Sequence, residues 1–83
     1  MNTDRTEALD LVRDSIVEVV PGADVASLEP DDAFREALEM DSLDFLRFVE
    51  TLSRRSGIPI EDEDATHLST LSACTDFLLA HGR

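Results

Sequence analysis

Ser42 is the residue whose type and position could best support chemistry in this chain. It lies in the run Met40-Asp41-Ser42-Leu43-Asp44, where a long connection is followed by a strongly apolar helical pattern. That position places the serine hydroxyl in the first turn of an expected helix, where backbone N–H groups lack partners and the helix dipole is positive. A phosphate esterified to Ser42 would be well accommodated there.

A nucleophilic role for Ser42 would need groups that the sequence does not supply. Serine hydrolysis requires a neighbouring base and an oxyanion hole, and no glycine-flanked nucleophile elbow surrounds Ser42. The two histidines, His67 and His81, lie in the last third of the chain without an evident orienting partner. The sequence therefore predicts that Ser42 is a substrate for modification and that the chain has no catalytic residue and no metal site. From these residues alone, a simple role in capping the helix together with Asp41 remains an alternative.

Apolar residues at helical spacing predict three main helices around one small core. The first is expected from about residue 5 to Val20, where Pro21-Gly22 stops it. The second is expected from its N-cap Asp41 to near Gly57, and the last from a cap at Ser69 to near His81 and Gly82. A one-turn helix is expected over the acidic stretch 61–64 between them.

The connection from Gly22 to Asp41 is long for a loop in a compact domain, so we expect it to be ordered. It should contain a helical turn near Asp32–Leu38 and be anchored on the core by its apolar residues, Leu28, Phe34 and Leu38. The predicted fold is thus an all-α bundle of three main helices and one short helix. Residues 1–83 should form a single domain.

The helix expected over residues 42–57 carries a wide apolar stripe. We expect Leu43 and Leu46 to hold this helix on the core. On the last helix Leu71, Cys74, Phe77 and Leu78 should point inward. Because Cys74 is the single cysteine, no internal disulfide can form, and we expect it to be a small buried hydrophobe.

The net charge of the chain limits the classes of partner that it can bind. Nineteen acidic residues face seven arginines, which gives a formal net charge of −12. Such a chain is repelled by nucleic acid and anionic membranes, so a basic protein is the expected partner. No apolar run approaches the roughly 20 residues of a membrane span, and the first ten residues do not resemble a signal peptide. We therefore expect a cytoplasmic protein without membrane insertion.

Taken together, these features resemble an acyl carrier protein. The resemblance extends from the first helix to Phe77-Leu78 and is carried by the motif Asp41-Ser42-Leu43 at the start of a helix, the chain length and the acidity. It also includes the acidic stretch 61–64 before Leu68-Ser69-Thr70-Leu71. The resemblance implies that Ser42, within its motif, receives a 4′-phosphopantetheine arm from a phosphopantetheinyl transferase that uses coenzyme A and magnesium. The arm's thiol would then carry acyl groups as thioesters.

The resemblance further implies partner and cargo surfaces. Acyl-loading and acyl-processing enzymes of fatty acid, polyketide or related lipid synthesis would dock on the exposed face of the helix over 42–57, at Asp44, Arg47 and Glu50. In this family the interior can open to shelter an acyl chain. The residues expected to line such a pocket are Phe45, Leu46, Val49 and Leu71. A monomer is expected.

The chain departs from the family pattern in two ways. Members commonly have glycine where this chain has Glu39, so Glu39 must adopt a backbone conformation that glycine takes freely, or the loop must differ. In addition, three arginines interrupt a helix face that is typically acidic: Arg47, Arg54 and Arg55. They could serve surface pairing and the helix dipole, with Asp44 or Glu50 pairing with Arg47, or they could mark a specialised set of partners.

Two other functions remain open from the sequence. A peptidyl carrier that loads amino acids would share the fold, but such carriers tend to have glycine pairs before the serine, where this chain has Glu39-Met40-Asp41. A helical adaptor would bind basic proteins through its acidic surface and would never be modified at Ser42.

Overall fold

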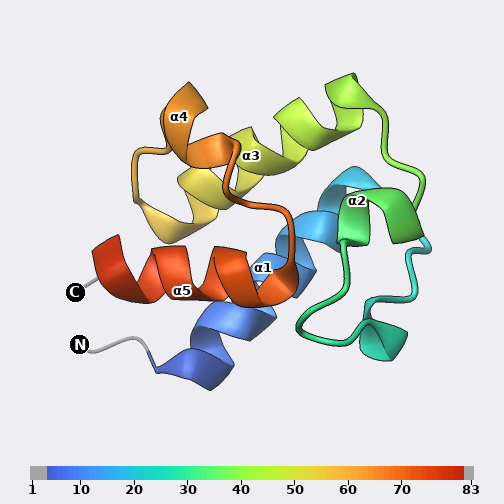
Figure 1. Cartoon of the computed structure of the whole chain (residues 1–83), viewed down its shortest axis with the longest axis horizontal. Coiled ribbons are helices and arrows are strands. Elements are labelled where there is room, and N and C mark those ends of the chain that lie inside the picture. The colour runs from blue at the N-terminus through green and yellow to red at the C-terminus, as the bar shows by residue number, and fades with distance from the viewer. Residues whose placement is uncertain (1–3, 82–83) are drawn as a thin grey trace.

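Three long helices and two one-turn helices make up most of residues 4–81, the part of the chain that the computed structural model describes (Figure 1). In chain order the elements are α1 (Arg5–Val19), a 3-10 turn η1 (Val25–Ser27), α2 (Phe34–Ala37), α3 (Ser42–Ser56), α4 (Asp62–Ala65) and α5 (Leu71–His81). Within these residues no strand is present. The all-α prediction, with three main helices, is confirmed.

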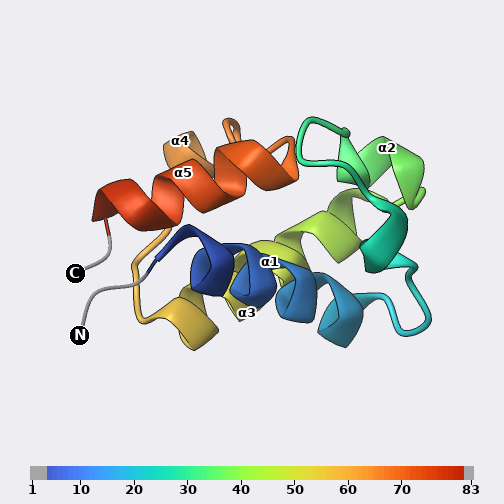
Figure 2. The ribbon, with the colours of Figure 1, turned by 90° about the horizontal axis from the view of Figure 1, so that it is seen from below.

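Helix α1 packs against both α3 and α5. Figure 2 shows α5 along one side of α1, with α3 behind it. The N-cap of α1 is Asp4, whose carboxylate accepts a hydrogen bond of 2.8 Å from the N–H of Glu7. Ala8, Val12 and Ile16 follow at intervals of four residues, and all three are fully buried. This spacing places them on one face of the helix, which explains why α1 lies at the centre of the bundle.

One cluster of apolar side chains forms the core. Its aromatic centre is Phe34 of α2 against Phe48 of α3, with ring centroids 5.1 Å apart in an edge-to-face arrangement. The cluster also contains Ala8, Val12, Ile16, Leu28, Met40, Val49, Leu52, Leu68, Leu71, Cys74 and Leu78. Burial raises the pKa of the Cys74 thiol to about 12, because a thiolate would be poorly solvated there. The prediction that Cys74 is a buried hydrophobe is confirmed.

The long connection between α1 and α3 is ordered, as predicted. Leu28 and Phe34 are buried and Leu38 is half-buried, so the three expected anchors do hold this segment on the core. The N–H of Ser72 also donates to the carbonyl of Pro30 at 2.8 Å, which ties the connection to α5. The helical turn is shorter than the predicted Asp32–Leu38, and η1 was not predicted.

The cap of α5 corrects one prediction. Thr70, rather than Ser69, caps the helix, because the Thr70 hydroxyl accepts a hydrogen bond of 3.0 Å from the N–H of Ala73. Both residues carry a hydroxyl that could serve, and the buried Leu71 fixes which of them directly precedes the helix.

Helix α3 has the ends that its sequence predicts. The Asp41 carboxylate accepts a hydrogen bond of 2.8 Å from the N–H of Asp44 and caps the first turn. Gly57 follows the last turn in the left-handed conformation, with φ of 73°, and its N–H donates to Ser53. None of the helices within residues 4–81 combines the length and apolar character that crossing a membrane requires.

Candidate functional site

Ser42 is the first residue of α3 and is exposed to solvent. The cap of the helix is supplied by the Asp41 carboxylate. The Ser42 hydroxyl instead accepts a hydrogen bond of 3.1 Å from Nη2 of Arg35. The hydroxyl is therefore not the group that caps α3. Its position on a capped helix that is packed into the core makes it accessible and fixed in place, which suits covalent attachment of a phosphate-linked group.

Arg35 is a part of this site that the sequence analysis missed. It lies in α2, and its guanidinium carbon is 5.0 Å from the centroid of the Phe45 ring, a distance typical of a cation–π contact. The available signal was that Arg35 is the single basic residue between Glu29 and Asp44. Its contact with Ser42, seven residues further on, depends on how the chain turns between α2 and α3.

That turn depends on Glu39. Glu39 has φ of 53°, and it is the single non-glycine residue with positive φ within residues 4–81. The N–H of Met40 donates to the carbonyl of Arg35 at 2.8 Å, which closes the end of α2 in the manner of a Schellman motif. Glycine is the usual residue at this position of the motif, and another L-residue adds about 1–2 kcal/mol of strain. Of the two possibilities raised by the sequence, Glu39 adopts the conformation of the glycine that it replaces.

Leu43 and Leu46 do not hold α3 on the core, so that prediction was wrong. Their side chains are 55% and 50% exposed. Leu43 and the fully buried Leu52 are nine positions apart, which places them on opposite faces of a helix that turns about 100° per residue. The helix is held instead by Phe48, Val49 and Leu52. Two large apolar side chains are therefore left on the surface close to Ser42.

The residues expected at the partner surface lie along α3. Arg47 and Glu50 are exposed, and Asp44 is half-buried. Among residues 4–81, Arg47 forms no ion pair, so the expected pairing with Asp44 or Glu50 is absent. Arg47 is therefore an exposed positive charge on α3 that no carboxylate within residues 4–81 neutralises.

The other two arginines of α3 do serve surface pairing. Arg54 and Arg55 both form ion pairs with Glu18 of α1, and the Arg55 contact measures 2.7 Å. The hydrogen bond from Arg55, together with the one from Arg54, holds the pKa of the Glu18 carboxyl below its usual value of 4.5. These two arginines therefore join the end of α3 to α1.

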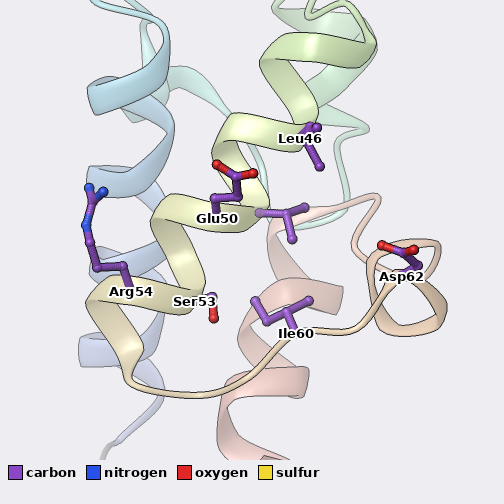
Figure 3. Close-up of a pocket in the computed structure, with 7 residues that line it drawn as sticks. Leu46, Glu50, Ser53, Arg54, Ile60 and Asp62 are labelled. Atoms are coloured by element: carbon purple, nitrogen blue, oxygen red, sulfur yellow. The ribbon is translucent and has the colours of Figure 1, made fainter.

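The residues expected to line an acyl pocket are divided among three places. Leu46 and Val49 line an open pocket of about 400 Å³ between α3 and the segment leading to α4. Figure 3 shows Leu46 and Ile60 pointing into this space, whereas Arg54 points toward α1. Phe45 lines a second pocket, of about 320 Å³, together with Arg35, Leu68 and Ala65 of α4. Leu71 is fully buried in the core.

Comparisons with known proteins cover nearly all of these elements. The family model described as a phosphopantetheine attachment site matches residues 10–78, a range that includes Ser42. The chain is 32% identical over 78 residues to an acyl carrier protein of Rubrobacter xylanophilus, covering 94% of this chain and 95% of the relative. Acyl carrier proteins of Myxococcus xanthus and Micrococcus luteus are each 30% identical over 63 residues, which is 76% of this chain and 80% and 78% of the relatives.

Proposed function

The chain belongs to the acyl carrier proteins, non-catalytic carriers that hold acyl groups on a 4′-phosphopantetheine arm, and we propose that Ser42 is the residue to which its arm is attached. When bound, the arm supplies a thiol on which acyl groups are held as thioesters. Asp41 and Leu43 complete the motif around the serine. The family interacts with a phosphopantetheinyl transferase and with enzymes that load and process acyl groups.

The observation that carries the proposal is that Asp41, and not Ser42, caps the start of α3. The Asp41 carboxylate caps the helix, so the Ser42 hydroxyl is not needed for capping and is exposed to solvent, where a transferase can reach it. The phosphate of the arm would lie at the amino end of a 15-residue helix, where the dipole is positive. The guanidinium of Arg35, 3.1 Å from the Ser42 oxygen, adds a full positive charge beside that position.

We propose that partner enzymes dock along α3 beside Ser42, at Asp44, Arg47 and Glu50. The exposure of Leu43 and Leu46 supports this surface, because two large apolar side chains on a charged helix favour contact with another protein. Arg47 forms no ion pair among residues 4–81, which favours partners that offer an acidic group at that point. The enzymes would be those of fatty acid, polyketide or related lipid synthesis.

We also propose that the cargo is sheltered by Phe45, Leu46, Val49 and Leu71. Support comes from the two pockets beside α3, one lined by Leu46 and Val49 and the other by Phe45. Leu71 would become part of such a pocket when the core opens. One shared core within residues 4–81 supports a single domain. The monomeric state and the cytoplasmic location stay predictions.

The intact mass of the purified protein tests the attachment. Wild type would be incubated with a broad-specificity phosphopantetheinyl transferase, coenzyme A and magnesium, alongside Ser42→Ala. We expect one phosphopantetheine on wild type and none on Ser42→Ala. Ser69→Ala is a matched control, because Ser69 is also exposed, and it should be modified as fully as wild type. No mass increase in wild type would favour the unmodified adaptor.

A further inference from the structure

Arg35 is a cation held beside the attachment residue by two contacts. Its Nη2 donates to the Ser42 oxygen at 3.1 Å, and its guanidinium carbon lies 5.0 Å from the centre of the Phe45 ring. The Phe45 ring is half-buried, and its centroid lies 6.0 Å from the ring centroid of the fully buried Phe48. The guanidinium is therefore supported by a side chain that is itself fixed on the core, although it is reached by solvent.

No carboxylate within residues 4–81 forms an ion pair with Arg35. The lack of an ion pair is unexpected, because four acidic residues follow Arg35 within nine positions of the sequence: Glu36, Glu39, Asp41 and Asp44. The Asp41 carboxylate is engaged instead with the backbone of α3. The guanidinium of Arg35 is consequently free to pair with an anion that arrives at the Ser42 oxygen.

We propose that Arg35 binds the phosphodiester of the arm in the modified protein, an inference that rests on the proposed attachment at Ser42. Modification turns the Ser42 oxygen into an ester oxygen bonded directly to phosphorus. The two non-bridging oxygens on that phosphorus share a negative charge. The Nη2 atom, already 3.1 Å from the ester oxygen, needs only a small side-chain movement to reach them. A planar guanidinium with several N–H groups matches this pair of oxygens.

The binding has an electrostatic reason. The phosphodiester places a further negative charge next to Asp41 and Asp44 in a chain whose formal net charge is already −12. Without a cation at this point, modification would add repulsion at the start of α3. With Arg35 in place the new charge is paired. The contact with Phe45 restrains the guanidinium beforehand, which lowers the entropy lost when it binds. Arg35 would thus fix the base of the arm and the direction in which it leaves the protein.

The test compares the modified and unmodified forms of wild type, Arg35→Gln and Arg5→Gln. Arg5→Gln is the matched control, because it removes the same charge from an exposed arginine whose side chain contacts Asp76 and Ser72 of α5 rather than Ser42. Arg35→Lys keeps the charge but removes the planar fork. Intact mass establishes modification of each variant, and the ³¹P NMR resonance of the arm and the melting temperature are then measured.

We expect the ³¹P resonance to be displaced in Arg35→Gln, unchanged in Arg5→Gln and intermediate in Arg35→Lys. The change in melting temperature on modification should be less favourable by about 1 to 5 °C in Arg35→Gln than in wild type, as for a surface charge pair in a domain of this size. This difference should shrink in high salt.

The readouts separate this inference from the attachment itself. A modified Arg35→Gln with the same ³¹P resonance and the same melting change as wild type would overturn the role of Arg35 and leave the attachment intact. An equal displacement in Arg5→Gln would also overturn it, because the effect would then reflect net charge alone. If wild type gained no mass, the attachment at Ser42 would be wrong, and the role of Arg35 would be wrong with it.

Discussion

The two ends of α3 differ in how well the flanking residues suit their backbone conformation. Each has a neighbouring residue with positive φ: Gly57 at 73° after the helix and Glu39 at 53° before it. Glycine adopts this conformation without strain, whereas a residue with a Cβ atom does not. The end of α3 is therefore built from residues suited to their positions, and its start is approached through a residue that is not.

The two ends of α3 also differ in how their side chains are engaged. At the end of α3, Arg54 and Arg55 are both engaged with Glu18 of α1. At its start, Leu43 and Leu46 remain on the surface, and Ser42 is exposed, with its hydroxyl hydrogen-bonded to Arg35 of α2. Strain and exposed apolar surface are thus concentrated at the end of α3 where we propose that the arm is attached. Backbone strain tends to occur at functional sites, where the surrounding structure maintains it.

The largest effect should come from replacing Gly57. Gly57→Ala would place a Cβ atom at φ of 73°, and because no atom lies within 4 Å of that position, the cost comes from the backbone alone. We expect the free energy of unfolding to fall by about 1 kcal/mol and the melting temperature by about 4–8 °C. Gly57→Asn is the control, since asparagine tolerates this conformation and should lose less. Equal losses would show that the conformation is not the cause.

Replacing Glu39 should have the opposite sign and a smaller size. Glu39→Gly removes the strain at φ of 53° but makes the unfolded chain more flexible, so we expect a net gain of about 0.5 kcal/mol. Chemical denaturation of the unmodified protein measures it. Glu39→Gln removes the charge and keeps the Cβ atom, and its stability should stay closer to that of wild type. A loss of stability in Glu39→Gly would contradict the view that the approach to α3 is strained.

The smallest effect should be the pH dependence of the Glu18 contacts. Because the folded pKa of Glu18 lies below 4.5, its ion pairs contribute stability above about pH 4.5, and this contribution is lost as the pH falls through the folded pKa. Melting temperatures of wild type and Glu18→Gln should therefore differ at neutral pH and converge in acid. A difference that persisted at pH 2 would have to come from packing rather than from charge.

Much of the fold could be predicted because its signals are local. The cap at Asp41, the stop at Gly57 and the apolar residues between them define α3 without reference to other segments. The burial of Leu28 and Phe34 likewise follows from large apolar residues in a connection that is rich in acidic side chains. Features of this kind depend on the helix period and on turn chemistry, which the sequence displays directly.

Other features depend on how the helices pack, and these were missed. The apolar stripe of α3 is wider than the face that the core can cover, so its sequence pattern does not indicate that Leu43 and Leu46 are left outside. The hydrogen bond from Arg35 to Ser42 depends on the turn at Glu39, which brings two helices together. Tertiary contacts of this kind have no periodic signature in the sequence.

The most direct test of the attachment at Ser42 is the location of the added mass. Trypsin cuts after arginine, so cleavage at Arg35 and Arg47 releases residues 36–47, a peptide in which Ser42 is the single hydroxyl-bearing residue. After treatment with transferase, coenzyme A and magnesium, we predict that this peptide alone carries phosphopantetheine and that fragmentation places it on Ser42. An unmodified peptide 36–47, with the added mass elsewhere or absent, would contradict the account.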